Sequence, residues 1–244
     1  MSESRVRYLE IAKALRESIQ SDYQPGELLP AEGKLADRYQ VNRHTLRRAI
    51  DELVQDGLIR RYQGIGCRVL NAPIDYALHD KAAFTHNLSQ GDMSLETQVL
   101  SLQTTELPEA ITHRLKLESH PAVQQLQTKR LIDHQPVSLI RHYLFDTSEE
   151  IIQEYKSGSL HVFLNERLGW SLRRGHTRLR ARMPNMNECQ QLDIDRSIAL
   201  MEIHTQNFDR ESGRLKEYSI ARSRSDLFDY TLEPSSPVVE ETTL

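Results

Sequence analysis

The 244-residue chain has only two cysteines and one tryptophan, and it has no long apolar run. No stretch approaches the roughly 18 consecutive apolar residues of a membrane-spanning helix. Cys67 and Cys189 lie far apart and lack metal-ligand spacing, so we expect two free thiols and no cofactor or metal held by them. The opening MSESRVRYLE contains no apolar signal core, which predicts a cytoplasmic protein without a membrane partner.

A strong excess of basic charge is also missing. The net charge is −4, and the 12 basic and 10 acidic residues of 1–70 give this part +2 while the remainder carries −6. A segment with so small an excess cannot bind nucleic acid through bulk charge. Any such binding must come from the local placement of a few cations.

Such a local placement occurs in NRHTLRRAIDELVQDG, residues 42–57. Asn42 is a preferred N-cap and Gly57 a preferred C-terminal stop. The apolar positions follow a helical period: Leu46, Ala49, Ile50, Leu53 and Val54. The cations cluster in the first turn and a half: Arg43, His44, Arg47 and Arg48. A helix N-terminus disfavours cations, so this pattern indicates an anionic partner, the alternative being a solvated polar face.

The flanking sequence favours the anionic partner. Residues 7–21 have the period of a helix, and PAEGKLADRY (30–39) has that of a second, separated from the basic helix by Gln40 and Val41. Residues 58–62 and 67–70 predict a hairpin whose turn contains Gly64 and Gly66. Three helices followed by a two-stranded wing predict a winged helix-turn-helix over residues 1–70.

The run LLPAEGKLADRYQVNRHTLRRAIDELVQDGLIRRYQGIGCRV resembles the DNA-binding domain of the GntR superfamily of bacterial regulators, over residues 5–70. The resemblance implies that the basic helix enters the major groove of a double-stranded operator. Contacts to base edges or nearby phosphates would come from Arg43, His44, Thr45 and Arg47. Phosphates would be held by Arg48, Arg60 and Arg61, and Gly64 and Gly66 would let the wing approach the minor groove. Gly33 departs from the family, which often has a polar or basic residue there.

The remainder of the chain predicts an α+β domain over residues 93–232, following a polar linker over 71–92. Strands are expected at 95–105, 122–132, 136–145, 172–183, 198–208 and 217–224. Helices are expected at 108–115, 147–155, 159–168 and 187–192. Hairpin connections between the strands indicate an antiparallel sheet. The acidic ending EPSSPVVEETTL, residues 233–244, predicts a disordered tail.

Two segments of this domain indicate an anion site. In LRRGHTRLRARM, strand alternation would place five cations on one face: Arg174, His176, Arg178, Arg180 and Arg182. This face is interpreted as the wall of a pocket for an acidic ligand, or else as a solvated sheet face. In SGSLHVFL, Ser157, Gly158 and Ser159 precede a helix and suit a phosphate or phosphonate, unless Ser159 is a plain N-cap.

Residues 86–232 resemble the UTRA effector domain, which has a chorismate-lyase-like fold, in the HutC-type branch of the superfamily. The resemblance rests on the segment Arg130 to Pro136, on SGSLHVFL, RRGHTRLRA and NECQQLDI, and on KEYSIARSRSD. It implies an effector pocket formed by Arg130, Arg141, Ser157, Ser159, Arg174, Arg178, Glu217 and Tyr218. The combined motifs look most like branch members that regulate phosphonate utilisation, which implies a phosphonate or phosphate ester as effector.

These features predict a ligand-responsive transcriptional regulator, most simply a repressor that binds an inverted repeat as a homodimer. An effector that is a sugar phosphate or an amino-acid breakdown product is a second reading. An enzyme is a distant third, because the resembled fold also houses a lyase. Against an enzyme, the sequence shows no nucleophile placed with a base, no metal cluster and no phosphate loop; Glu217 is the one candidate for a base in a cationic pocket.

Overall fold

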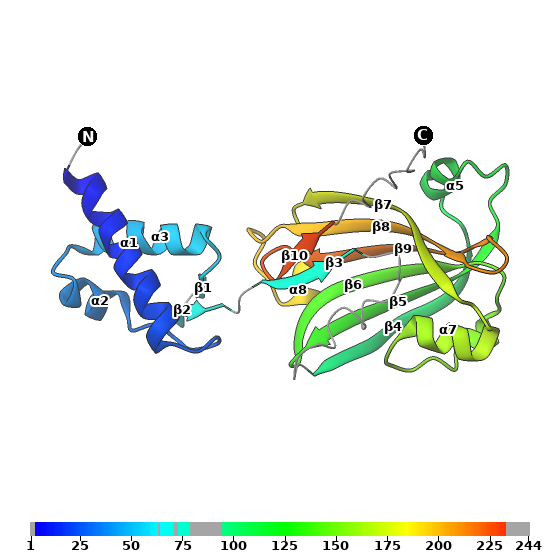
Figure 1. Cartoon of the computed structure of the whole chain (residues 1–244), viewed down its shortest axis with the longest axis horizontal. Helices are drawn as coiled ribbons and strands as arrows, with labels where there is room; N and C mark the ends of the chain where they lie inside the picture. The colour runs from blue at the N-terminus through cyan, green and yellow to red at the C-terminus, as the bar shows by residue number, and fades with distance from the viewer. Residues whose placement is uncertain (1–2, 63, 71–72, 79–93, 233–244) are drawn as a thin grey trace, which may run out of the picture. The chain divides into compact units, whose positions relative to one another are not determined.

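The computed structural model of the chain describes residues 3–62, 64–70, 73–78 and 94–232. The chain divides into two compact units, Met1–Pro73 and Ile74–Leu244 (Figure 1). Each unit has its own hydrophobic core. The architecture is α+β, as the sequence predicts, with a small helical first unit and a second unit built on one large sheet.

The first unit is a winged helix-turn-helix, which confirms the prediction. Its elements are α1 (Glu3–Asp22), α2 (Glu32–Arg38), α3 (Arg43–Gln55), β1 (Ile59–Tyr62) and β2 (Gly66–Val69). The two strands pair antiparallel as the wing. The predicted apolar stripe of α3 is buried from Leu46 to Leu53, whereas Val54 is exposed. The buried stripe packs on Leu15 and Leu35 of the other two helices, so the core sets the angle at which α3 is presented.

The start of α3 is determined by its cap. The side-chain oxygen of Asn42 accepts a hydrogen bond from the backbone N–H of Thr45 at 2.8 Å. This contact satisfies one of the unpaired donors of the first turn. Arg43 is consequently the first helical residue, and the basic cluster occupies the beginning of the helix.

The second unit contains a six-stranded antiparallel sheet in the order β4-β5-β6-β9-β8-β7. Its strands are β4 (Leu95–Glu106), β5 (Ala122–Ile132), β6 (Gln135–Leu144), β7 (Leu172–Arg182), β8 (Leu200–Asp209) and β9 (Leu215–Arg224). The helices are α5 (Glu109–Leu115), α6 (Glu149–Ile152), α7 (Leu160–Leu168) and α8 (Met186–Leu192). Every predicted strand is present, with shifts of a few residues at the ends.

A short strand lies inside the segment expected to be a linker. Residues Ile74–Ala77 form β3, which pairs parallel with β10 (Phe228–Thr231) (Figure 1). The linker prediction over 71–92 is therefore wrong for these four residues. They are too few to show alternation, and their pairing partner is at the other end of the domain sequence. The expected tail, 233–244, and the rest of the linker, except residues 73 and 78, lie outside the described residues.

The two faces of the sheet carry different side chains, and we call them face A and face B. Directly paired residues of neighbouring strands share a face. Leu144 pairs with Glu217 on face A, and Tyr143 pairs with Tyr218 on face B. Helices α6 and α7 pack on face A in a cluster with Leu144, while α5 packs on face B in a cluster with Tyr143 and Tyr218.

A bulge in β7 divides the predicted row of cations between the two faces. Arg174 pairs with Asn207 and Thr177 pairs with Thr205, so β7 has one residue more than β8 between these pairs. Arg174 therefore lies on face A, whereas Arg178 pairs with His204 on face B. The prediction that one face carries all five cations is wrong, because a bulge reverses the alternation and the sequence pattern does not reveal it.

Gly175 in this bulge has no room for a side chain. A Cβ at this position would lie 2.5 Å from a ring carbon of Phe208 and 3.2 Å from the backbone oxygen of Gln206. We expect Gly175→Ala to destabilise the second unit by about 1–3 kcal/mol through overpacking. Urea unfolding of the full chain measures this.

A matched glycine substitution in the first unit serves as the control. A Cβ at Gly33 would meet only Arg43 Nη2, at an ordinary 3.5 Å. Because alanine favours the helix, Gly33→Ala should stabilise the first unit by up to about 1 kcal/mol. Equal unfolding curves for Gly175→Ala and the wild type would contradict the packing constraint at the bulge.

Candidate functional site

The start of α3 presents its basic side chains to solvent. Arg43, His44 and Arg47 are exposed and Thr45 is half-buried, while Leu46 beneath them is completely buried. The apolar stripe thus anchors the helix in the core, and the first turn remains accessible. This placement brings together four residues that the sequence predicts to contact DNA.

A carboxylate that the sequence reasoning did not single out organises two of the predicted arginines. Glu32, the first residue of α2, lies 2.8 Å from Arg47 Nε and 3.6 Å from Arg61 Nε. Arg61 Nη1 also lies 2.8 Å from Asp51 Oδ1 on α3. These pairs are partly exposed, so each contributes at most about 1 kcal/mol and can be exchanged for a phosphate contact. Glu32 therefore orients Arg47 on α3 and Arg61 on the wing through ion pairs that are weak enough to break.

The remaining predicted DNA contacts have different surroundings. The guanidinium of Arg48 stacks over the Tyr8 ring of α1, 4.1 Å from the ring centroid. Arg48 is therefore half-buried and already makes a cation–π contact within the first unit. Arg60 is half-buried on β1. Gly64 and Gly66 have φ of +76° and +124°, a conformation that favours glycine and turns the wing sharply. Ile65 between them is 59% exposed, which makes it the apolar tip of the wing.

The second unit contains a small cavity on face A, which we call the effector cavity after the effector pocket that the sequence resemblance predicts. Its volume is about 60 Å³. Its polar and aromatic lining comprises Tyr76, Arg130, His142, His161, Arg174, Thr205, Asn207, Glu217, Ser219, Ser223 and Tyr230. These residues come from β3, β5, β6, α7, β7, β8, β9 and β10. The cavity is thus assembled from the whole length of the domain.

Glu217 accepts hydrogen bonds from three neighbouring side chains in this cavity. Its carboxylate oxygens lie 2.5 Å from His142 Nδ1, 2.7 Å from His161 Nε2 and 2.6 Å from Asn207 Nδ2. Burial alone would raise the pKa of Glu217, but the charge of His161 and the hydrogen bonds from both histidines outweigh it and hold the pKa well below 4.5. Glu217 is therefore an ionised structural partner and is unsuited to the role of a general base.

The structure separates the residues that the resemblance assigns to one pocket. Arg130, Arg174 and Glu217 line the effector cavity. Arg141, Arg178 and Tyr218 lie on face B, since they pair with residues of that face. The hydroxyl of Tyr218 accepts a hydrogen bond from Arg114 at 2.8 Å, so it is occupied there.

The serine turn also lies apart from the cavity lining. Ser157 is exposed, and Ser159 is the N-cap of α7, accepting from the backbone N–H of Val162 at 3.4 Å. The structure thus shows the plain N-cap that the sequence leaves open as an alternative. The nearby residue that does line the cavity is His161, in the first turn of α7.

Several lining residues were missed by the sequence reasoning. His142 alternates with Arg141 along β6, and strand alternation assigns the two to opposite faces. Tyr76 and Tyr230 come from the parallel pair β3–β10, and their ring centroids lie 5.4 Å apart. No local pattern identifies that pair, because its strands are short and distant in sequence.

Cysteines, metal-binding clusters and membrane-spanning helices can be examined in the described residues. Both cysteines are free and buried. Within residues 3–62, 64–70, 73–78 and 94–232, no three His, Cys, Asp or Glu side chains are arranged to hold a metal ion. In the same residues, no helix has the length and apolarity needed to span a membrane.

Comparisons with known proteins match both units. Residues 7–69 match the model of the bacterial regulatory proteins of the gntR family, and residues 90–229 match that of the UTRA domain. The probable transcriptional regulator PhnF of Escherichia coli (strain K12) is 39% identical over 229 residues, which cover 93% of this chain and 95% of that protein.

Solved structures show the same fold. The crystal structure of PhnF from Mycobacterium smegmatis matches with a TM-score of 0.63 at 20% identity, covering 93% of this chain and 99% of that one. A PhnF C-terminal domain matches with a TM-score of 0.56 at 28% identity, covering 68% of this chain and 99% of that one.

A winged helix with an exposed basic recognition helix, followed by a domain with a polar cavity, defines a DNA-binding transcriptional regulator with an effector domain. The chain belongs to the GntR family of bacterial transcriptional regulators, among the members that carry a UTRA domain. This family consists of regulators, so the lyase-like enzyme considered from the sequence is set aside.

The bonding of Glu217 predicts a pH dependence of stability. Because the folded pKa lies below the ordinary 4.5, the stabilisation is fully present above pH 4.5 and is lost as the pH falls through the folded pKa. Glu217→Gln removes the charge at nearly constant size, so this part of the acid destabilisation should disappear. Urea unfolding at several values between about pH 3 and pH 7 measures it.

The exposed Glu166 on α7 provides the control. Glu166→Gln should follow the wild-type pH curve. If Glu217→Gln also followed it, the buried carboxylate would not be the group that titrates with folding.

Proposed function

We propose that the protein is a homodimeric repressor of genes for phosphonate uptake and degradation. It acts in the cytoplasm, where it binds an inverted-repeat operator, and it responds to a small anionic metabolite. A dimer is proposed because two helix-turn-helix units read the two half-sites of such a repeat.

The exposed start of α3 supports the proposed DNA contacts and is the observation that carries the proposal. The contacts to base edges or nearby phosphates in the major groove are assigned to Arg43, His44, Thr45 and Arg47, which lie in the first turns of α3. An arginine that pairs with guanine discriminates against other bases by about 1–3 kcal/mol. The phosphate contacts and the wing contacts are assigned to Arg48, Arg60, Arg61, Gly64 and Gly66. The arginines among them add salt-dependent affinity that does not depend on the DNA sequence.

The chemistry of the effector cavity supports a small anionic effector. Arg130 and Arg174 both line it, and among the described residues Arg174 Nε is buried without a hydrogen-bond partner. Asn207 Oδ1 is likewise buried and unbonded. A phosphonate monoanion suits both atoms, because its oxygens accept from arginine while its P–OH donates to the amide oxygen.

The size of the cavity favours a phosphonate over a sugar phosphate. Pockets for larger ligands occupy roughly 300–1,000 Å³, and this one has about 60 Å³. The relative at 39% identity is named PhnF, which agrees with the resemblance to regulators of phosphonate utilisation. Ligand binding would release the operator if the ligand prefers a dimer whose recognition helices are wrongly spaced.

The DNA contacts are tested by substitution in α3. In gel-shift assays with the DNA upstream of its own gene, the wild type should bind, and Arg43→Ala or Arg47→Ala should weaken binding measurably. Each lost base contact costs about 1–3 kcal/mol, or roughly 5- to 150-fold. Arg196→Ala removes an exposed cation from the second unit and should bind as the wild type does. Intact binding by both α3 variants would refute the assignment.

The effector is tested by calorimetry with methylphosphonate and glucose 6-phosphate as probes. Methylphosphonate should bind, and Arg174→Gln should weaken it by tenfold or more because a charged hydrogen bond contributes about 1.5–3 kcal/mol. Arg173 is the exposed neighbour of Arg174 and stacks on Phe208. Arg173→Gln should therefore leave the binding of methylphosphonate unchanged. Binding of glucose 6-phosphate alone would favour a sugar phosphate as effector, and turnover of either probe would indicate an enzyme.

A further inference from the structure

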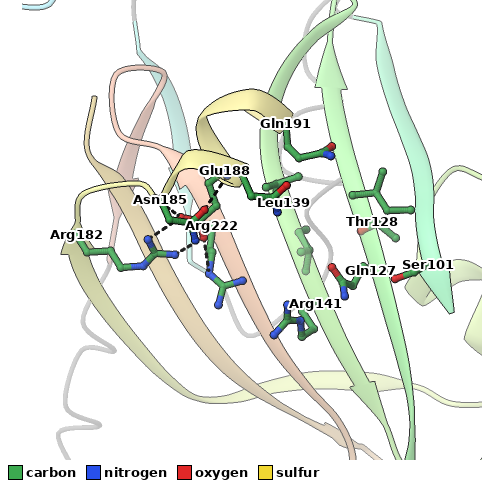
Figure 2. Close-up of a pocket in the computed structure, with 13 residues that line it drawn as sticks. Ser101, Gln127, Thr128, Leu139, Arg141, Arg182, Asn185, Glu188, Gln191 and Arg222 are labelled. Carbon is green, nitrogen blue, oxygen red and sulfur yellow. Dashed lines mark hydrogen bonds and ion pairs between the residues drawn. The ribbon is translucent and has the colours of Figure 1, made fainter. Parts of the chain in front are cut away.

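A second, larger pocket lies on face B, opposite the effector cavity. Its volume is about 490 Å³, and Figure 2 shows the side chains that line it. Charged side chains line one side of it, namely Arg141, Arg182, Arg222 and Glu188, and amides such as Gln127 and Gln191 line the other. We call it the face B pocket. It shares no charged residue with the effector cavity.

Two buried carboxylates are already neutralised at this pocket. Arg182 lies 2.9 Å from Glu202 and contacts both oxygens of Glu188, at 2.8 and 2.5 Å. Arg222 Nε lies 3.1 Å from Glu202 and 3.3 Å from Glu188. Despite the opposing effect of burial, hydrogen bonds from His204, Arg182 and Arg222 lower the pKa of Glu202 to about 2. Arg180 also lies 3.4 Å from Glu202, so three arginines hold the two acids as carboxylates.

Arg141 is the third arginine of the pocket lining, and no acid among the described residues pairs with it. In the part of the chain that the structure describes, it forms no ion pair, and its buried Nε has no hydrogen-bond partner. Arg141 pairs with Ile220 and Leu139 pairs with Arg222, so the two arginines are diagonal neighbours on face B. Figure 2 shows both side chains at the same pocket. Counting Arg180, four guanidinium groups thus lie near two carboxylates, and the surplus charge is positive.

We propose that the face B pocket is a second ligand site, for an organic phosphate with several hydroxyl groups. Its phosphate lies between Arg141 and Arg222, because a guanidinium fork binds phosphate through parallel hydrogen bonds. Its hydroxyls bond to Gln127, Gln191 and Asn187, whose amides both donate and accept. The volume falls in the range of roughly 300–1,000 Å³ that is typical of metabolite pockets.

The proposed site is separate from the effector cavity, but both are lined by residues of strand β6. Arg141 and His142 are consecutive on β6, and alternation directs one to each face. A ligand in the face B pocket would therefore contact the strand that also carries the effector cavity. The two ligands differ in size, since the phosphonate proposed for face A needs far less volume.

Calorimetry of the full-length protein with ribose 5-phosphate as the probe tests the site. The wild type should bind it, and Arg141→Gln should weaken binding at least tenfold. Because Arg141 has no ion pair among the described residues, the substitution should leave the melting temperature unchanged or raise it. Lys129→Gln removes another face B cation that does not line the pocket, and it should bind as the wild type does.

Methylphosphonate distinguishes this site from the effector cavity. Arg141→Gln should bind methylphosphonate as the wild type does, and ribose 5-phosphate should still bind when methylphosphonate is saturating. The proposal is overturned if ribose 5-phosphate fails to bind the wild type at millimolar concentration, or binds Arg141→Gln equally well. It is also overturned if Arg141→Gln instead shifts the sedimentation coefficient, because the pocket would then be a contact between subunits.

Discussion

The buried carboxylate of Glu217 is the interaction on which the effector domain depends most. It joins β9 to His142 on β6, to His161 on α7 and to Asn207 on β8. A buried charge is tolerated only when it is paired and hydrogen-bonded, so these four side chains hold one another in place. Asn207 Oδ1 and the nearby Arg174 Nε are buried in the lining of the effector cavity without a hydrogen-bond partner among the described residues.

The pleat of the sheet distributes the arginines between two chemical environments. On face A, Arg130 and Arg174 line a small cavity, whose wall also contains the neighbouring rings of Tyr76 and Tyr230. On face B, Arg182 and Arg222 pair with buried acids, while Arg141 lines a larger pocket and has no ion pair among the described residues. The bulge at Gly175 is essential to this division, since without it Arg174 would lie with Arg178 on the other face.

In the DNA-binding unit, one acid, Glu32, pairs with two of the clustered arginines. Cations at the start of a helix are electrostatically unfavourable in the free protein. Glu32 on α2 offsets part of this cost by pairing with Arg47 and Arg61, and it fixes the recognition helix against the wing. Arg43 and His44 remain exposed beside them. The pairs are partly exposed, so each contributes at most about 1 kcal/mol to the free energy of unfolding.

The sequence by itself determined the elements whose signals are local. The Asn42 cap, the apolar period of α3 and the glycines of the wing are short-range features, and alternation was enough to locate all six strands of the sheet. Only the tertiary structure decided which side chains share a cavity. The pairing of β3 with β10, the bulge at Gly175 and the partners of Glu217 depend on contacts between distant segments, and a one-residue change of register moves a side chain to the opposite face.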